Sequence, residues 1–338
     1  MRCHRQGGIV AELLRETSCT VLPSNTVQLH PGYRILAEAA FDVGLTPADP
    51  LAQPLEEARH QNESYYRFLG GSPEPVASVM DVTVAGPHGP YRLRVYHPEG
   101  SRSLPVTLYF HGGGYVLNGL DTHDSLLRLL ANKSGVAICG LAYSKAPEAR
   151  FPVQLDEARH AISWLKTKGA GFGLDSTRVV LSGDSAGAHL ALTAALAERD
   201  SGRADLRGLV LAYGMFAPSF DSSSHKIFRQ GYGLTSERMR WFWDQFLLPG
   251  QDRSHPLVAP VWADLAGLPK TLVLAAAFDC LRDDSLQLSR RLELAGVPNR
   301  LSVYDGMQHA FLMAHAWLPP ARRAVDEIAE TIRDWLIE

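Results

Sequence analysis

The residues most suited to nucleophilic chemistry form the segment Gly183-Asp184-Ser185-Ala186-Gly187. An apolar run at 179–181 precedes this segment and a stretch rich in Ala and Leu follows it, so the serine lies on a predicted strand-to-helix turn. Such a turn exposes the serine hydroxyl, and glycines on both sides let neighbouring backbone approach closely. The start of the helix also favours developing negative charge. We therefore interpret Ser185 as a nucleophile for attack on a carbonyl carbon, rather than as part of a turn without chemistry.

A glycine-rich loop directly follows an earlier predicted strand and reads H-G-G-G over residues 111–114. Successive glycines can turn several N–H groups toward one point, as the oxyanion of a tetrahedral intermediate requires. We expect the N–H groups of Gly112 and Gly113, with that of Ala186 beside the nucleophile, to form this oxyanion hole. A phosphate-binding loop is the alternative, but no Gly-Lys-Ser/Thr follows and the next residues are apolar.

A nucleophilic serine also needs a base and an acid that orients the base. His309 comes just after the last predicted strand, where it can reach the edge of the sheet that carries the serine, whereas His315 lies nearer to the final helix. Asp279 closely follows the preceding predicted strand and is the favoured acid. Asp305 is an alternative near His309 in sequence, while the acidic pair at 283–284 is better placed to cap the next helix.

The elements that must position these residues alternate along the chain from about residue 80 onward. Eight β-rich runs predict strands at 78–84, 91–97, 106–110, 136–141, 178–182, 208–213, 271–275 and 301–304. Helical patterns lie between or after them at 123–133, 152–168, 186–199, 284–295 and 320–337. The later strands are almost wholly apolar, which favours a mostly parallel α/β sheet covered by helices on both faces. No helix separates the first two strands, so we expect them to form an antiparallel hairpin at one edge.

Two segments interrupt this alternation. Residues 1–75 are mostly helical in pattern, and residues 216–262 form a long insertion after a strand that is rich in aromatic side chains. A long insertion in a compact domain is often a functional lid, although an ordinary packing subdomain would give the same pattern. We expect a single domain over residues 1–338, with a catalytic core at about 76–215 and 263–338 and a helical cap from the two interrupting segments.

The composition argues against several other classes of function. With 46% hydrophobic and 20% charged residues, the chain resembles an ordinary globular enzyme, and its formal net charge of −3 predicts no surface for nucleic acid or an acidic membrane. No uncharged apolar run is long enough for stable membrane insertion, and residues 1–16 lack the apolar segment of a signal peptide. The four cysteines have no C-x-x-C spacing and fit free thiols in a cytoplasmic protein: Cys3, Cys19, Cys139 and Cys280.

Taken together, these residues resemble the hormone-sensitive-lipase-like branch of the α/β-hydrolases. That branch carries H-G-G-G, then G-D-S-A-G, then a D-x-L-x-D acid loop and a late H-x-F histidine. All four motifs occur here in that order, over about residues 80–315. Within the branch, the strings at 120–124, 147–152 and 183–200 are similar to those of bacterial acetyl esterases.

The resemblance implies a carboxylic-ester hydrolase that uses Ser185, Asp279 and His309 as a triad and forms an acyl-enzyme. It further implies the α/β-hydrolase fold with a helical cap, a small ester with a short acyl chain as substrate, and no metal or organic cofactor. Members of the branch include monomers and homodimers. This chain departs from many relatives at Ala188-His189, where many carry Gly-Asn, and at Cys280, where proline is common.

Two other functions fit parts of this pattern. The first is amide or peptide hydrolysis on the same fold, although the sequence contains no propeller domain or other feature that predicts a peptide-length cleft. The second is non-catalytic ligand binding, as in the plant gibberellin receptors that resemble this family and lack the histidine. The presence of His309 in its expected context favours catalysis.

Overall fold

The fold is built on one mixed β-sheet. The computed structural model describes residues 28–100, 103–203 and 205–337. Within these residues the strands are β1 (Ser78–Gly86), β2 (Gly89–His97), β3 (Leu104–Phe110), β4 (Ala137–Ala142), β5 (Leu174–Asp184), β6 (Leu206–Ala212), β7 (Thr271–Phe278) and β8 (Asn299–Gln308). They lie in the order β1-β2-β4-β3-β5-β6-β7-β8, with β3 to β8 parallel. β1 pairs antiparallel with β2, which in turn pairs antiparallel with β4.

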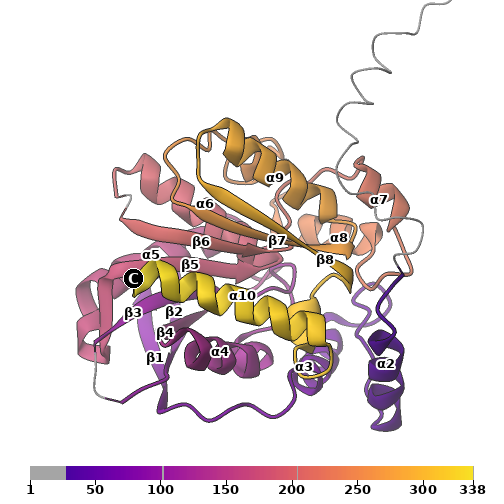
Figure 1. Ribbon diagram of the computed structural model, residues 1–338. Helices are drawn as coiled ribbons and strands as arrows, with labels where there is room; N and C mark the ends of the chain where they lie inside the picture. The colour runs from indigo at the N-terminus through magenta and orange to yellow at the C-terminus, as the bar shows by residue number, and fades with distance from the viewer. Residues whose placement is uncertain (1–27, 101–102, 204, 338) are drawn as a thin grey trace, which may run out of the picture.

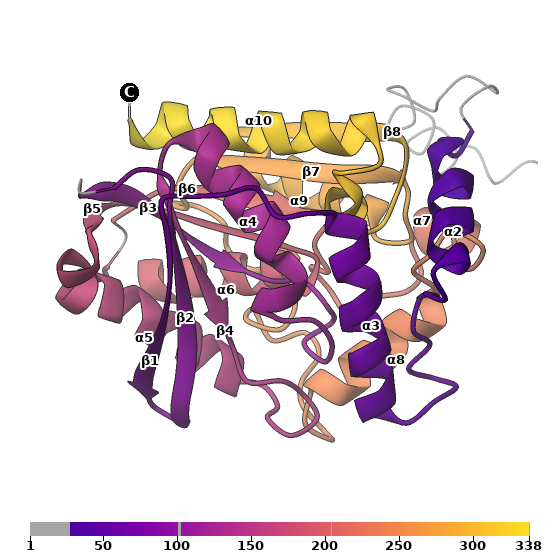
Figure 2. The same ribbon diagram turned by 90° about the horizontal axis from the view of Figure 1, so that it is seen from below.

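Helices cover both faces of this sheet (Figures 1 and 2). In the described residues they are α2 (Gly32–Asp42), α3 (Leu55–Gly70), α4 (Leu120–Ser134), α5 (Val153–Lys168), α6 (Ala186–Asp200), α7 (Ser223–Ile227), α8 (Ser236–Phe246), α9 (Arg282–Leu294) and α10 (Pro319–Leu336). α4 and α10 pack on one face, and α5, α6 and α9 pack on the other. Because successive strand residues point to opposite faces, Val180 and Leu181 of β5 enter different hydrophobic cores. This double burial explains why the central strands are almost entirely apolar.

The fold class expected from the sequence is confirmed. All eight predicted strands occur, and the first two form the antiparallel hairpin at one edge of the sheet. The ends differ from the prediction because pairing with a neighbouring strand extends them: β5 begins at Leu174, and β8 continues to Gln308. His309 is therefore the first residue after the edge strand.

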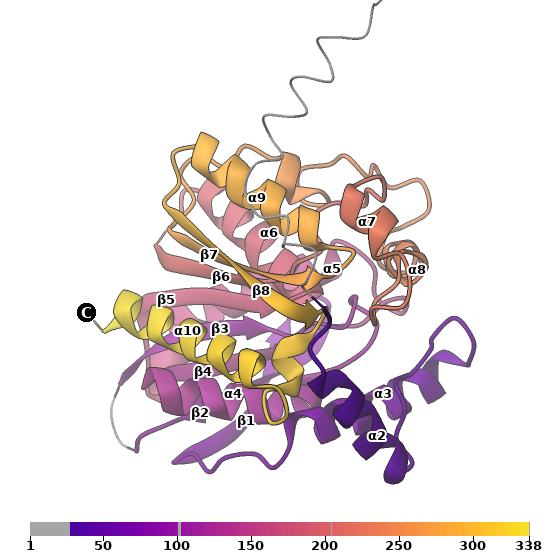
Figure 3. The same ribbon diagram turned by 45° about the vertical axis from the view of Figure 1, so that its right-hand side comes forward.

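The elements outside the regular α/β alternation gather at one end of the sheet. α2 lies next to α3 there, and α7 lies next to α8 (Figure 3). Arg59 fastens α3 to the core, because its guanidinium donates to the carbonyl oxygens of Val116 (2.9 Å) and Ala146 (2.8 Å) and pairs with Glu148 (2.7 Å). The helices of the first segment and of the 216–262 insertion lie at the same end of the sheet (Figure 3), although about 150 residues separate them in sequence.

Two further expectations concern the membrane and the cysteines. In the part of the chain that the structure describes, every helix is too short or too polar to cross a bilayer. Cys139 and Cys280 are buried free thiols, and burial raises the pKa of Cys139 to about 12. Cys3, Cys19 and the segment tested for a signal peptide lie outside the described residues.

His189 joins α6 to the insertion that follows β6. Its Nε2 faces the carbonyl oxygen of Val258 at 2.9 Å, and its Nδ1 lies 2.6 Å from the hydroxyl of Tyr115. A carbonyl only accepts, so Nε2 carries the proton and Nδ1 accepts from Tyr115. The neutral ring thus satisfies both contacts, and burial lowers the pKa of His189 to about 4.

This histidine predicts a loss of stability in mild acid. The pKa of His189 rises from about 4 in the folded chain to about 6.5 after unfolding, so its contribution is complete above pH 6.5 and declines as pH falls toward 4. The decline is on the order of 3 kcal/mol. We expect His189→Asn to flatten the dependence of unfolding free energy on pH over this window, measured by urea titration. His60→Asn, at an exposed position, is the control, and an equally steep dependence in His189→Asn would contradict the assignment.

Candidate active site

Ser185 occupies the sharp turn between β5 and α6. Its backbone has φ 54° and ψ −118°, a conformation that costs a non-glycine residue about 1–3 kcal/mol. The turn is possible because a Cβ on Gly183 would overlap the Gly187 carbonyl, and a Cβ on Gly187 would overlap the carbonyl oxygen of Phe110 at the end of β3. The two glycines thus let the elbow pack against its neighbouring strand, as the motif predicts.

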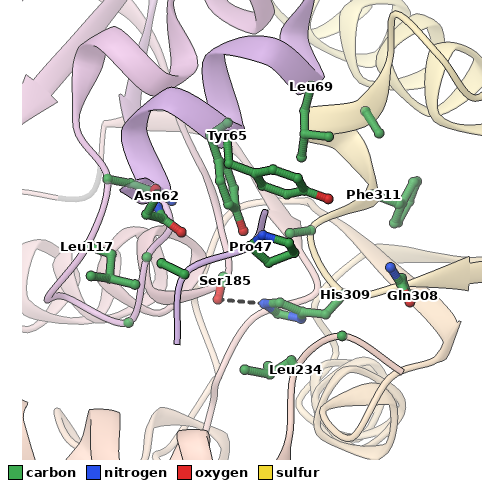
Figure 4. A pocket seen from close by; sticks show the side chains of 18 of the residues that line it. Pro47, Asn62, Tyr65, Leu69, Leu117, Ser185, Leu234, Gln308, His309 and Phe311 are labelled. Atoms are coloured by element: carbon green, nitrogen blue, oxygen red, sulfur yellow. Dashed lines mark hydrogen bonds between the residues drawn. The ribbon is translucent and has the colours of Figure 1, made fainter. Parts of the chain in front are cut away.

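The structure brings Ser185, His309 and Asp279 into one hydrogen-bonded chain. The Ser185 Oγ lies 2.9 Å from His309 Nε2, and His309 Nδ1 lies 2.7 Å from Asp279 Oδ2 (Figure 4). Asp279 is only 1% exposed, and its other carboxylate oxygen accepts from the backbone N–H of Leu281. Because the strand order places β5, β6, β7 and β8 side by side, the three residues reach the same edge of the sheet from separate strands.

The hydrogen-bond partners determine which nitrogen of His309 carries the proton. An ionised carboxylate only accepts, so Nδ1 donates to Asp279 and Nε2 is left as an acceptor for the Ser185 hydroxyl. The ring also packs edge-on against Tyr213, with 5.0 Å between ring centroids. The arrangement can therefore remove a proton from Ser185 and stabilise the charged imidazole that results.

The competing acids and the competing histidine lie elsewhere. Asp305 is an exposed residue of β8, and His315 is buried against the carbonyl oxygen of Leu312. The expectation that Asp283 and Asp284 cap a helix is wrong, because α9 begins at Arg282 and includes both. Their carboxylates instead accept from backbone N–H groups of the segment after β6, at Ser224 and Phe216 respectively, and burial raises the pKa of Asp284 to about 8.

The glycine loop differs from the expected oxyanion hole in one donor. The N–H of Gly112 donates to Asp184 Oδ1 at 2.8 Å, so it is already used and cannot serve an oxyanion. Gly113 and Gly114 follow with φ of 118° and 63° and line the cavity beside Ser185. Within the described residues neither of their N–H groups has an acceptor. The expectation for Gly112 is therefore corrected: its N–H anchors the loop.

Asp184 is a site residue to which the sequence analysis assigned no role. Asp184 is 2% exposed, and its Oδ1 accepts from the Tyr109 hydroxyl (3.0 Å), the Gly112 N–H and His123 Nε2 (3.1 Å). Burial alone raises the pKa of Asp184. His123, Tyr109 and the Gly112 N–H lower it by a larger amount, so the pKa lies below its ordinary value and the carboxylate stays ionised. The only signal in the sequence was its place between Gly183 and the nucleophile.

A cavity of about 340 Å³ lies over Ser185 and His309. Its lining combines Ser185 and His309 with residues of the helices at this end of the sheet, including Asn62 and Tyr65 of α3 (Figure 4). Most of the remaining lining is apolar, from Leu36, Leu69, Leu117, Leu234 and Phe311. No motif marked these helical residues, because they are ordinary residue types at positions that only the tertiary structure brings together.

Asp184 predicts a defect in turnover. Asp184→Asn should lower kcat by about tenfold or more with a smaller change in KM, because all three hydrogen bonds end on Oδ1 and a neutral amide oxygen accepts them more weakly than a carboxylate, so the loop beside Ser185 is held less firmly. Steady-state kinetics with p-nitrophenyl acetate as a probe ester would measure this. Asp205→Asn, an exposed acid paired with Lys166, is the control. An unchanged kcat in Asp184→Asn would show that the anchor is not needed.

Known proteins share both the sequence and the fold of this chain. A family model described as alpha/beta hydrolase fold matches residues 107–313. An ethyl acetate hydrolase of Pseudomonas putida is 30% identical, over 83% of this chain and 90% of that protein. An acetyl esterase of Salmonella choleraesuis is 33% identical, over 76% of this chain and 80% of that protein. These matches confirm the resemblance inferred from the four motifs.

Solved structures agree with these relatives. A hyperthermophilic esterase of the archaeon Pyrobaculum calidifontis superposes with a TM-score of 0.83 at 33% identity, covering 91% of this chain and 98% of that structure. A thermostable esterase of Pseudomonas putida superposes with a TM-score of 0.83 at 28% identity, covering 93% and 99% respectively. The chain therefore belongs to the α/β-hydrolase family, in the hormone-sensitive-lipase-like branch to which these esterases are similar.

Proposed function

We propose that this chain hydrolyses carboxylic esters with short acyl chains, using Ser185 as nucleophile, His309 as general base and acid, and Asp279 as the orienting acid. The observation that carries the proposal is the hydrogen-bonded series from Ser185 Oγ through His309 to Asp279, with spacings of 2.9 and 2.7 Å, at the floor of a cavity. The relatives named as an acetyl esterase and an ethyl acetate hydrolase support the same reaction class.

The proposed reaction has two halves. His309 Nε2 accepts the Ser185 proton while the serine oxygen attacks the ester carbonyl, and Asp279 stabilises the imidazolium that forms. His309 then gives this proton to the departing alcohol, which leaves an acyl group on Ser185. Water attacks the acyl-enzyme by the same route, with His309 again as base, and releases the acid.

The oxyanion is held by backbone N–H groups of Gly113, Gly114 and Ala186 in this proposal. The first two line the cavity without an acceptor among the described residues, and the third is the first N–H of α6, which has no partner within the helix. Each such donor is typically worth about 3 kcal/mol in the transition state. The positive end of the α6 dipole points at the same place.

The preference for short acyl chains and the role of the cap are parts of the same proposal. α3 and α8 lie over Ser185 and contribute Tyr65, Leu69 and Phe242 to the lining of a cavity of about 340 Å³. This volume is at the lower end of the range for small-molecule sites. We assign α2, α3, α7 and α8 to a cap that excludes water and limits the length of the acyl chain.

The first prediction from this proposal concerns the nucleophile and the acyl chain. With p-nitrophenyl esters from acetate to palmitate, wild-type kcat/KM should be highest for the shortest chains and fall steeply as the chain grows. Ser185→Ala should lose roughly four orders of magnitude or more, because the covalent route is removed. A spectrophotometric assay of released p-nitrophenol measures both effects.

Ser163→Ala, at an exposed serine of α5, is the control and should match the wild type. Substantial turnover by purified Ser185→Ala would overturn the choice of nucleophile. A rate that rises toward long chains would overturn the short-chain preference while leaving ester hydrolysis intact.

A second prediction concerns the acid. Asp279→Asn should lower kcat by roughly 10⁴-fold, because an amide can hold His309 in the wrong tautomer and cannot stabilise its charged form. Stopped-flow acylation of the enzyme by p-nitrophenyl acetate would locate the defect in the chemical step. Asp305→Asn, at an exposed position on β8, is the matched control. If the two variants exchanged these outcomes, Asp305 would be the acid.

A further inference from the structure

Arg238 is the only lysine or arginine among the described residues that line the cavity over Ser185. It lies in the first turn of α8, where its backbone N–H donates to the side chain of Thr235 at 3.1 Å. This bond caps the helix and holds the residue at the cavity wall. The position of the cation in the site is therefore set by secondary structure rather than by an ion pair.

The guanidinium of Arg238 is under-used within the described part of the chain. One of its terminal nitrogens, Nη2, donates to the carbonyl oxygen of Ala48 at 3.2 Å, but its Nε is buried without an acceptor and it forms no ion pair. Arg59 gives the contrast, because it uses two carbonyl oxygens and both carboxylate oxygens of Glu148. Arg59 has the contacts of a structural arginine. The Arg238 guanidinium, in contrast, has N–H groups that donate to no described residue.

The groups around Arg238 suit an anion from outside the protein. Tyr65 and Tyr66 line the same cavity, and neither hydroxyl is hydrogen-bonded to a described residue. Burial raises the pKa of Tyr66 to about 12, and the nearby Arg238 guanidinium partly offsets this. Among the described lining residues Asp184 is the one carboxylate, and its Oδ1 accepts from Tyr109, Gly112 and His123 rather than from Arg238.

A cation with unmet hydrogen-bonding capacity in a mainly apolar cavity is costly unless a partner arrives. The planar fork of arginine fits the two oxygens of a carboxylate. We propose that Arg238 binds a carboxylate of the substrate, so that the preferred esters of this chain carry a carboxylate a few bonds from the scissile ester. The inference rests on the proposed ester hydrolysis at Ser185 and specifies its substrate class.

The test compares anionic esters with neutral esters of the same shape. Monoethyl succinate, which has its carboxylate on the acyl side, is paired with ethyl isocaproate. Acetoxyacetate, which has its carboxylate on the alcohol side, is paired with isobutyl acetate. In each pair an isopropyl group replaces the carboxylate, so the ratio of the two kcat/KM values measures recognition of charge. Whichever pair shows the effect identifies the side of the ester that faces Arg238.

Arg238→Gln, which keeps a donor for Ala48, should lower this ratio by about tenfold or more in one pair, mainly through KM of the anionic ester. Arg238→Lys should retain part of the preference. Arg240→Gln is the matched control, because Arg240 lies on the same helix but is exposed and packs over Phe220. The inference would be overturned if the ratio were unchanged in both pairs, or if kcat/KM fell equally for the anionic and the neutral ester. The role of Arg238 would then be limited to its hydrogen bond with Ala48.

A binding measurement separates this inference from the proposed reaction. In the Ser185→Ala background, ligand-observed NMR should detect monoethyl succinate or acetoxyacetate at the cavity, with binding weakened about tenfold or more when Arg238→Gln is added. Failure of the wild type to hydrolyse any ester would refute the proposed function alone. Binding that is equal with and without Arg238→Gln would refute the role of Arg238 even if hydrolysis is fast.

Discussion

The buried carboxylate of Asp184 is the constraint on which the geometry of the site depends. It lies one residue before the nucleophile and accepts hydrogen bonds from β3, from the glycine loop and from α4. A buried charge is costly unless hydrogen bonds compensate it, and the three donors all point at Oδ1, so these three segments meet at one point. The same meeting places Gly113 and Gly114 beside Ser185. Positioning of the proposed oxyanion donors and compensation of a buried charge are thus one structural requirement.

Much of the fold could be predicted from the sequence because local patterns and global structure agree. The apolar runs became the buried strands, and the short segments after them supplied Ser185, Asp279 and His309, which the structure brings together. Such residues are recognisable because they directly follow strands, so a correctly predicted strand also places the residue after it at the end of the sheet. Gly112 marks the limit of this reasoning. The H-G-G-G motif does not indicate which of its N–H groups donates a hydrogen bond to a neighbouring carboxylate.

The remainder of the site depends on long-range packing that no local pattern records. Asn62, Arg238 and Phe242 belong to helices with no regular relation to the strands, yet all three line one cavity. Their positions follow from contacts such as those of Arg59 with the loop after β3 and of Arg238 with Ala48. An aromatic or cationic residue on an amphipathic helix has the same appearance in sequence whether it meets solvent or substrate. Chemistry was therefore easier to predict than specificity.

The strand order carries a consequence for biosynthesis. Ser185 and His309 are 124 residues apart, and His309 comes into place only when β8 adds to the edge of the sheet beside β7. Contacts this distant in sequence form late, since the intervening chain must be ordered first. With His309 as the proposed base, a nascent chain that has already folded the Ser185 turn and the glycine loop still lacks a base for its serine. Under the proposed mechanism the chain gains ester turnover only after its last parallel strand has joined the sheet, so turnover is a measure of the completed sheet.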